Sequence, residues 1–410
     1  MIFDRLKFVE KNFSSIPFTS KEYFITTHES IYDKIDFRLM IKSIIKLVGS
    51  VSGSLWLKNN KQGDYFVYHG GLKTKLEMEK LFSEGLSIHT VSDKHTDNSD
   101  SAKRFSSLIY VLDKKFIKIF NSLIFDSSIS FRLKVLMLSD LFWNYGYYSY
   151  FKKAILNKKN VLSFFSTSQL AFSLHEACKD INKPFIFYSW GSNQGFEEFK
   201  YSSADITLVK NSYDFNLFSR IGSYGKLIKF GDLSLSDVKN TRDLFIKNAA
   251  RILIVDTCLS SKVNAEKKFI IYKRIFDSLS SVSSTFTVRP HPATRVCELS
   301  ELLSKFSGDV LMENEKSIFE QAQDADLVIN INSTVGIQLI SLGIPVYEIY
   351  DEGYAYGYLN EEYPGLVFSN KNNVYPGDKV FFSEKLESFM LSQGIMPADL
   401  SLLKNCLRRC

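Results

Sequence analysis

The stretch that decides the fold opens with Thr285-Phe-Thr-Val-Arg-Pro-His-Pro292, continues through Leu327-Val-Ile-Asn-Ile-Asn-Ser-Thr-Val-Gly336 and closes with Leu342-Gly-Ile-Pro-Val-Tyr-Glu-Ile349. Short apolar runs that end in polar, Gly or Pro positions are typical of buried parallel strands. Ligands of open α/β sheets bind beyond the carboxyl ends of the strands, and both polar clusters of this stretch fall there. The stretch therefore predicts two strands of a parallel sheet with a ligand site at their ends.

The two polar clusters predict a phosphate site. Asn332, Ser333 and Thr334 stand at the start of an expected helix, where free backbone N–H groups and hydroxyl donors favour an anion. Arg289 and His291 follow the neighbouring strand of the prediction, and we expect them to reach the same anion. The alternative is a stiff strand exit beside a serine that only caps a helix.

Length and composition favour two domains. The chain has 410 residues, of which 45% are apolar, enough for two cores. Phenylalanine and tyrosine number 35 and 21, and we attribute part of this aromatic content to compositional bias. The net charge of +6 fits an anionic substrate or an anionic membrane surface and does not indicate nucleic acid.

Targeting signals and cysteines favour a cytoplasmic protein. The five cysteines are scattered without a CxxC pair, as expected in a reduced compartment. The N-terminus lacks the apolar core of a signal peptide, and no run approaches the roughly 18 apolar residues of a membrane span. Membrane contact would thus be peripheral, on the inner face, through the basic residues 402–410. A frayed helix end is the simpler account of that tail.

Strands and helices alternate from residue 160 onward. A first set comprises strands at 161–165, 183–188, 204–209 and 227–230 and helices at 168–182 and 214–221. A second set comprises strands at 251–256, 285–288, 310–312 and 327–331 and helices at 265–279, 298–306 and 317–323. The alternation predicts an α/β fold of two Rossmann-like, doubly wound domains across a cleft. We expect an N-terminal acceptor-side domain at 1–235, a C-terminal nucleotide-donor domain at 236–375 and a helical tail at 376–410.

Residues 1–150 are less regular. A strand at 65–68 runs into His69-Gly-Gly71, and the polar residues 90–104 are interpreted as an exposed loop. The aromatic cluster within a helix predicted at 139–153 favours core packing over a sugar-stacking site.

The two halves resemble GT-B glycosyltransferases. More narrowly, Arg289-Pro-His-Pro292, Asn332-Ser-Thr-Val-Gly336 and Leu342-Gly-Ile-Pro-Val346 are similar to motifs of a bacterial surface-polysaccharide group. That group includes capsule sialyl- and polysialyltransferases, the β-Kdo transferases of capsule assembly and the CDP-glycerol glycerophosphotransferases of teichoic acid synthesis. Its His-Pro motif and Ser/Thr motif hold the phosphate of the donor nucleotide. The resemblance covers roughly residues 160–350.

The resemblance implies a nucleotide-sugar donor, with a CMP-linked sugar favoured, and a glycan or lipid-linked glycan acceptor. His291 would bind or protonate the donor phosphate, and a carboxylate at Glu348 or Glu313 would take the ribose hydroxyls. The predicted donor site comprises Arg289, His291, Pro292, Asn332, Ser333, Thr334, Gly336, Glu313 and Glu348. Neither a cofactor nor a metal is expected, because no His/Cys cluster has ligand spacing.

The catalytic base is less clearly marked. Sialyltransferases of this group carry an acidic pair before a glycine where this chain has Ser189-Trp-Gly191. His69 is similar to the histidine of the His-Gly-x-x-Leu-Lys motif of the glycerophosphotransferases and ranks slightly above Glu197, with Asp232 as a third candidate. We expect a glycosyltransferase of capsule or lipopolysaccharide synthesis. The alternatives are a CDP-polyol phosphotransferase and a binding or assembly component that lacks a base.

Overall fold

The structure is a computed structural model, and it describes the chain in segments. They are residues 64–69, 88–92, 100–101, 147–166, 169–189, 202–235, 244–245, 250–256, 265–279, 285–291, 296–306, 310–312, 316–331, 335–344, 346–349, 359–363, 367–369, 379–380, 390–392 and 394–409, with single residues between them.

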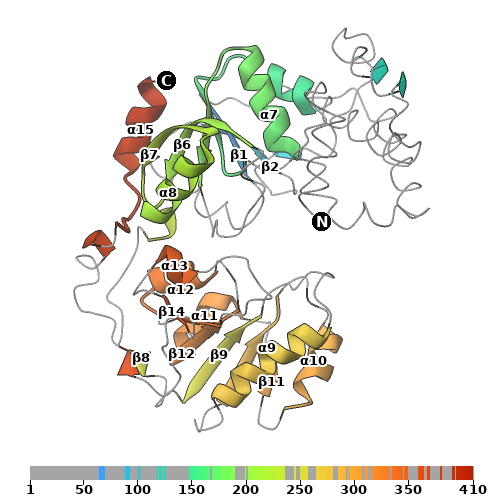
Figure 1. Ribbon diagram of the computed structural model, residues 1–410, viewed down its shortest axis with the longest axis vertical. Helices are drawn as coiled ribbons and strands as arrows, with labels where there is room; N and C mark the ends of the chain where they lie inside the picture. Colours follow the sequence, from blue (N-terminus) through green and yellow to red (C-terminus); the bar gives the residue numbers. More distant parts are fainter. Residues whose placement is uncertain are drawn as a thin grey trace.

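A seven-stranded parallel sheet forms the first half, in the order β3-β2-β1-β4-β5-β6-β7. Its strands are β1 (Tyr65–His69), β2 (Ile88–Ser92), β3 (Asp100–Ser101), β4 (Asn160–Ser163), β5 (Phe185–Tyr188), β6 (Ala204–Val209) and β7 (Tyr224–Lys229). Helices α7 (Gln169–Asp180) and α8 (Ser212–Ile221) pack on it (Figure 1). The local sequence sets the bounds of α8, since the Asn211 side chain accepts from Asp214 N at the start and Gly222 takes φ 75° at the end.

A six-stranded parallel sheet forms the second half, in the order β11-β10-β9-β12-β13-β14. Its strands are β9 (Arg251–Val255), β10 (Thr285–Arg289), β11 (Val310–Met312), β12 (Leu327–Asn330), β13 (Val346–Glu348) and β14 (Val367–Ser369). Its helices are α9 (Ala265–Ser278), α10 (Val296–Leu303), α11 (Ile318–Asp324), α12 (Val335–Ser341) and α13 (Leu359–Glu362). All four residues of β12 are buried, as its unbroken apolar run predicts for a central parallel strand.

Both sheets are doubly wound. Numbered along its own stretch of chain, the second sheet has the order 3-2-1-4-5-6, which is the order of dinucleotide-binding Rossmann sheets. The first sheet starts with the same order and adds β7 at its edge. The winding direction reverses between β1 and β4 in the first sheet and between β9 and β12 in the second. The α/β, doubly wound fold class predicted from the sequence is confirmed.

The C-terminal segment returns to the first sheet. After β15 (Lys379–Val380), which pairs with β8 (Leu244–Phe245), the chain forms bridges from Ile395 to Asn211 and from Pro397 to Asp232. Helix α15 (Leu400–Arg409) then lies beside β7 (Figure 1). Its Leu403 is buried in the same core cluster as Val67 and Leu162 of the first sheet. The predicted helical tail therefore supplies part of the first domain's core.

The predicted and the observed strand bounds agree best where an apolar run stands between turn residues. The predicted strands 204–209 and 310–312 match β6 and β11 to the residue. The exposed loop predicted at 90–104 is wrong in part, because residues 90–92 belong to β2 and residues 100–101 to β3. Strand β3 is polar throughout and β2 holds only Ile88 and Val91 as apolar residues, so their sequence carries little hydrophobic signal.

The described members of the aromatic cluster predicted in the first half belong to the core, as expected. Tyr147, Tyr148 and Tyr150 are at most 6% exposed and pack with Phe151 and strand β1. No helix in the described segments is long and apolar enough to cross a bilayer.

A buried histidine on α7 makes stability depend on pH. The His175 ring is 6% exposed and stacks on Phe185 at 4.7 Å. Burial and then the Lys179 cation lower its pKa to about 4, against the opposing effect of Asp205. An unfolded histidine takes up its proton near pH 6.5, so the stability that neutral His175 preserves above that pH is lost as the pH falls toward 4.

We expect this loss to reach about 3 kcal/mol and to be absent from a His175→Phe variant. Urea unfolding of both proteins between pH 7 and pH 4.5 gives the free energy of unfolding as a function of pH. The difference between the slopes of the two plots isolates His175, because the carboxylates common to both proteins contribute equally. Parallel slopes would show that His175 does not resist protonation in the fold.

Candidate functional site

Three of the predicted phosphate ligands, Arg289, His291 and Ser333, lie at one edge of the second sheet. Strand β9 stands between β10 and β12, with Val255 paired to Arg289 on one side and to Asn330 on the other. His291 follows β10 and Ser333 follows β12, so both residues flank the carboxyl end of β9 at the point where the winding reverses. The expectation that their strands are neighbours is wrong. Two strand spacings, roughly 10 Å, separate the ends of β10 and β12.

Ser333 occupies a covered position before α12. It is 9% exposed, its Oγ accepts from Val335 N at 3.4 Å, and its carbonyl accepts from Asn330 Nδ2 at 2.9 Å. A hydroxyl carries one donor proton beside its acceptor lone pairs, so the Ser333 Oγ can also donate. Because α12 has only seven residues, its dipole is smaller than that of a long helix. The hydroxyl is therefore the stronger phosphate ligand here.

Gly336 serves close packing. A Cβ at this position would lie 2.8 Å from Cδ1 of Leu359 and 3.3 Å from Nδ2 of Asn330. The missing side chain lets the first turn of α12 sit against α13 and the end of β12. A donor-binding role for Gly336 stays a prediction.

Two predicted charged ligands already have partners. Arg289 donates from Nη1 to the carbonyl of Lys316, in the segment before α11. Glu348 is 1% exposed and its Oε1 accepts from Leu359 N, the first residue of α13, at 3.2 Å. Glu348 is thus a buried carboxylate that caps the start of α13. Its ribose contact and the phosphate contact of Arg289 stay predictions.

The other predicted site residues are only partly described. His69 ends β1, beside the reversal point of the first sheet, and its side chain lies outside the described part. The residues entirely outside it are Glu197, Pro292, Glu313, Asn332 and Thr334.

Sequence reasoning missed two polar residues at the reversal point. Asp256 directly follows β9 and Asn330 ends β12, and each is at most 1% exposed. Within the part of the chain that the structure describes, Asn330 Oδ1 is a buried acceptor without a hydrogen-bond donor. Both residues end an apolar strand with a polar side chain, and this signal was available in the sequence.

The carboxyl edges of the two sheets meet through α13. Lys210, which follows β6, donates to Glu362 at 2.8 Å, and Tyr363 donates to Asp232, which follows β7. The first N–H of α13 donates to Glu348 at the end of β13. Asp232 is 4% exposed and held in this contact, so its position does not suit the third candidate base.

This is a GT-B fold. Two doubly wound sheets share one chain, their carboxyl edges face each other through α13, and the C-terminal segment returns to the first sheet. The described acids and cysteines hold no cluster of three or more groups suited to a metal ion. Metal independence stays a prediction.

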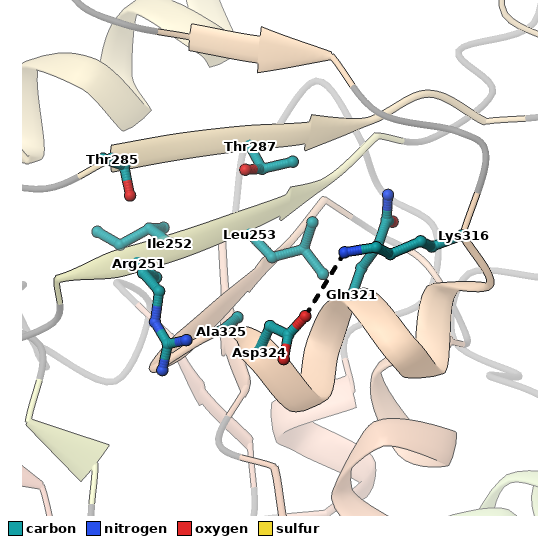
Figure 2. Close-up of a pocket in the computed structure, with 9 residues that line it drawn as sticks. All are labelled: Arg251, Ile252, Leu253, Thr285, Thr287, Lys316, Gln321, Asp324 and Ala325. Atoms are coloured by element: carbon teal, nitrogen blue, oxygen red, sulfur yellow. Dashed lines mark ion pairs between the residues drawn. The ribbon is translucent and has the colours of Figure 1, made fainter.

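The chain also holds the DxD sequence Asp324-Ala-Asp326, a pattern that can bind a metal ion, but it does not lie at the carboxyl ends of the strands. Asp326 pairs with Arg251 at 3.1 Å and Asp324 with Lys316 at 3.7 Å. Figure 2 shows Arg251, Lys316 and Asp324 among the residues that line a cavity between α11 and strands β9 and β10. The volume of this cavity is about 130 Å³. The cavity includes the first residues of both strands, whereas His291 and Ser333 follow the carboxyl ends.

No protein-family model matches the sequence, and no curated protein matches it. Solved structures of similar shape include the UDP-GlcNAc 2-epimerase from Neisseria meningitidis bound to UDP-GlcNAc, with a TM-score of 0.47, 10% identity and coverage of 84% of this chain and 100% of that chain. The lipopolysaccharide outer core galactosyltransferase WaaB has a TM-score of 0.47 and 12% identity over 84% and 99% of the two chains. MurG from Acinetobacter baumannii has a TM-score of 0.44 and 10% identity over 84% and 99%. At these values the similarities assign no activity.

Proposed function

We propose that this protein is a glycosyltransferase that takes a sugar from a nucleotide-activated donor, CMP-linked by preference, and builds a bacterial capsule or lipopolysaccharide glycan. The acceptor is a glycan or a lipid-linked glycan. The proposal includes a cytoplasmic location, with peripheral contact to an anionic inner leaflet through the basic C-terminal helix.

One observation carries the proposal. The second sheet has the Rossmann strand order, and its reversal point brings the His-Pro residue His291 and the Ser/Thr residue Ser333 to either side of the β9 end. A nucleotide that spans the end of β9 can meet an imidazole from one side and a hydroxyl from the other. Side chains from two strand ends roughly 10 Å apart can extend toward one phosphate placed between them.

Departure of the nucleotide needs only donor groups of the proposed site. As the bond between sugar and nucleotide breaks, negative charge grows on the leaving phosphate. His291 donates a proton or a hydrogen bond to that phosphate, and the Ser333 hydroxyl donates a second hydrogen bond. Donors fixed in a partly dry site stabilise such a developing charge without reorganising. The acceptor hydroxyl loses its proton to a base on the first domain.

Nucleotide binding gives the first test. We expect CMP or CDP to raise the melting temperature of the purified chain in a panel with UDP and GDP, since a ligand at a hundred times its Kd stabilises by about 2.7 kcal/mol. His291→Ala and Ser333→Ala should each weaken the affinity about tenfold, as expected for one hydrogen bond to a charged group.

The matched control is Ser304→Ala. Ser304 donates to the Glu301 carbonyl at the end of α10, and its loss should leave affinity unchanged. The proposal fails when none of the four nucleotides shifts the melting temperature, or when His291→Ala binds like the unmodified protein.

A CDP-polyol phosphotransferase is the second candidate. The position of His69 favours it, because this residue ends β1 beside the reversal point of the first sheet, as a base for the acceptor would. Donor turnover distinguishes the two functions. Release of CMP from a CMP-sugar supports the glycosyltransferase, and release of CMP from a CDP-polyol supports the phosphotransferase. Comparing His69→Ala with Glu197→Ala in the active assay identifies the base.

A further inference from the structure

One buried residue, Asp256, contacts both ends of the segment that carries His291. The backbone N–H of Asp256 donates to the carbonyl of Arg289 at 3.0 Å. The Asp256 carboxylate accepts from the Thr294 hydroxyl at 2.8 Å. His291 lies between these two anchors, and its carbonyl accepts from Thr294 N at 2.7 Å. The strand end and the turn after it are therefore both tied to Asp256.

The carboxylate is itself held rigidly by α9. Its Oδ2 accepts from Lys268 at 3.0 Å and its Oδ1 accepts from Tyr272 at 3.0 Å. Burial, followed by the neighbouring Asp256 charge, raises the pKa of Tyr272 well above its ordinary value, so the phenol remains a donor. Lys268, with 15% of its side chain exposed, neutralises the buried charge. Three donors thus orient one aspartate, counting the Thr294 hydroxyl.

The chain itself stiffens the same segment. Prolines precede and follow His291 in Arg289-Pro-His-Pro292, and each proline fixes its own φ. Prolines restrict the local conformation but do not place the segment relative to the sheet. The Thr294 hydroxyl supplies that placement, because it joins the turn to the end of the central strand β9.

We infer that Asp256 is a positioning residue of the nucleotide site and that Thr294 is its tether, together holding the His291 ring where a phosphate at the reversal point meets it. The inference rests on the proposed function. Asp256 touches no substrate and acts through the loop. This role requires the negative charge and both carboxylate oxygens of Asp256. Oδ1 accepts from Tyr272, and Oδ2 accepts from both Lys268 and Thr294.

The tether is tested in the full chain with the near-isosteric variant Thr294→Val, which leaves Asp256 paired with Lys268 and Tyr272. Calorimetric titration with CMP should show a Kd raised about fivefold to tenfold, the loss expected for one hydrogen bond. Thr294→Ser keeps the hydroxyl and should bind like the unmodified protein. Thr285→Val removes the hydroxyl that donates to the Ala250 carbonyl at the other end of β10, and it should have no effect.

A double-mutant cycle separates positioning from general stability. In a His291→Ala background the Thr294→Val substitution should cost no further affinity, because the ring it positions is absent. An undiminished loss in that background, or CMP affinity unchanged by Thr294→Val alone, would overturn the positioning role. Failure of the unmodified protein to bind CMP, CDP, UDP or GDP would instead overturn the proposed function, and the role with it.

Discussion

Replacing Lys210 with methionine is expected to destabilise the protein by about 3–5 kcal/mol, the cost of leaving a buried charge without its partner. The Lys210 side chain is 1% exposed and its Nζ lies 2.8 Å from Glu362 Oε2, across the contact between the two halves. Burial alone would lower its pKa, but the carboxylates of Asp214, Glu362 and Asp232 raise the pKa overall. Methionine would fill the space and leave these carboxylates without their cation.

Urea unfolding, followed separately by tryptophan fluorescence and circular dichroism, measures this loss. Because Lys210 joins the two domains, we also expect the transitions seen by the two probes to move apart in Lys210→Met. Lys226→Met is the control, since Lys226 is exposed on β7 and should change stability by no more than about 0.5 kcal/mol.

Adding Glu362→Gln to Lys210→Met should recover part of the loss, because it removes one of the stranded charges. Equal stability of Lys210→Met and Lys226→Met would mean that the ion pair between the domains contributes nothing.

The second large effect is expected at Gly231, where the C-terminal segment meets the first domain. Gly231 has φ 95°, and a Cβ there would lie 2.3 Å from the carbonyl oxygen of Pro397. Gly231→Ala combines an unfavourable backbone conformation, about 1–2 kcal/mol, with an overlap of backbone atoms that costs about 1–3 kcal/mol. We expect a total loss of about 2–5 kcal/mol and faster proteolysis after residue 393.

Gly222→Ala separates these two contributions. Gly222 also has a positive φ, 75°, but a Cβ there would meet no atom within 4 Å. It should therefore lose only about 1 kcal/mol and leave the C-terminal segment protected. If both variants lose the same stability, the Pro397 contact does not hold the segment in place.

How far the sequence predicts this structure depends on where the determining contacts lie. Strands β6 and β11 follow from local patterns, because a buried apolar run between turn residues suffices to define them. The same edge for His291 and Ser333 follows from the general rule on carboxyl ends. The insertion of β9 between β10 and β12 does not, since strand order depends on contacts far apart in the chain.

The site residues show the same division. Asp256 acquires its role only from partners 12, 16 and 38 positions away, which the fold brings together. The cap role of Glu348 was not predicted, because its partner Leu359 lies eleven positions away in the sequence. Residue type and strand position predict where a site lies, whereas the partner of each side chain follows only from the tertiary structure.

The return of the chain to the first sheet has a consequence for biosynthesis. The second domain is, topologically, an insertion within the first, because Leu403 completes a core cluster that begins at Val67. Domains made earlier usually fold earlier on the ribosome. In this chain we expect the first domain to complete its core only after α15 has been made. The second domain can therefore reach its native state first, and the first domain would then fold against it.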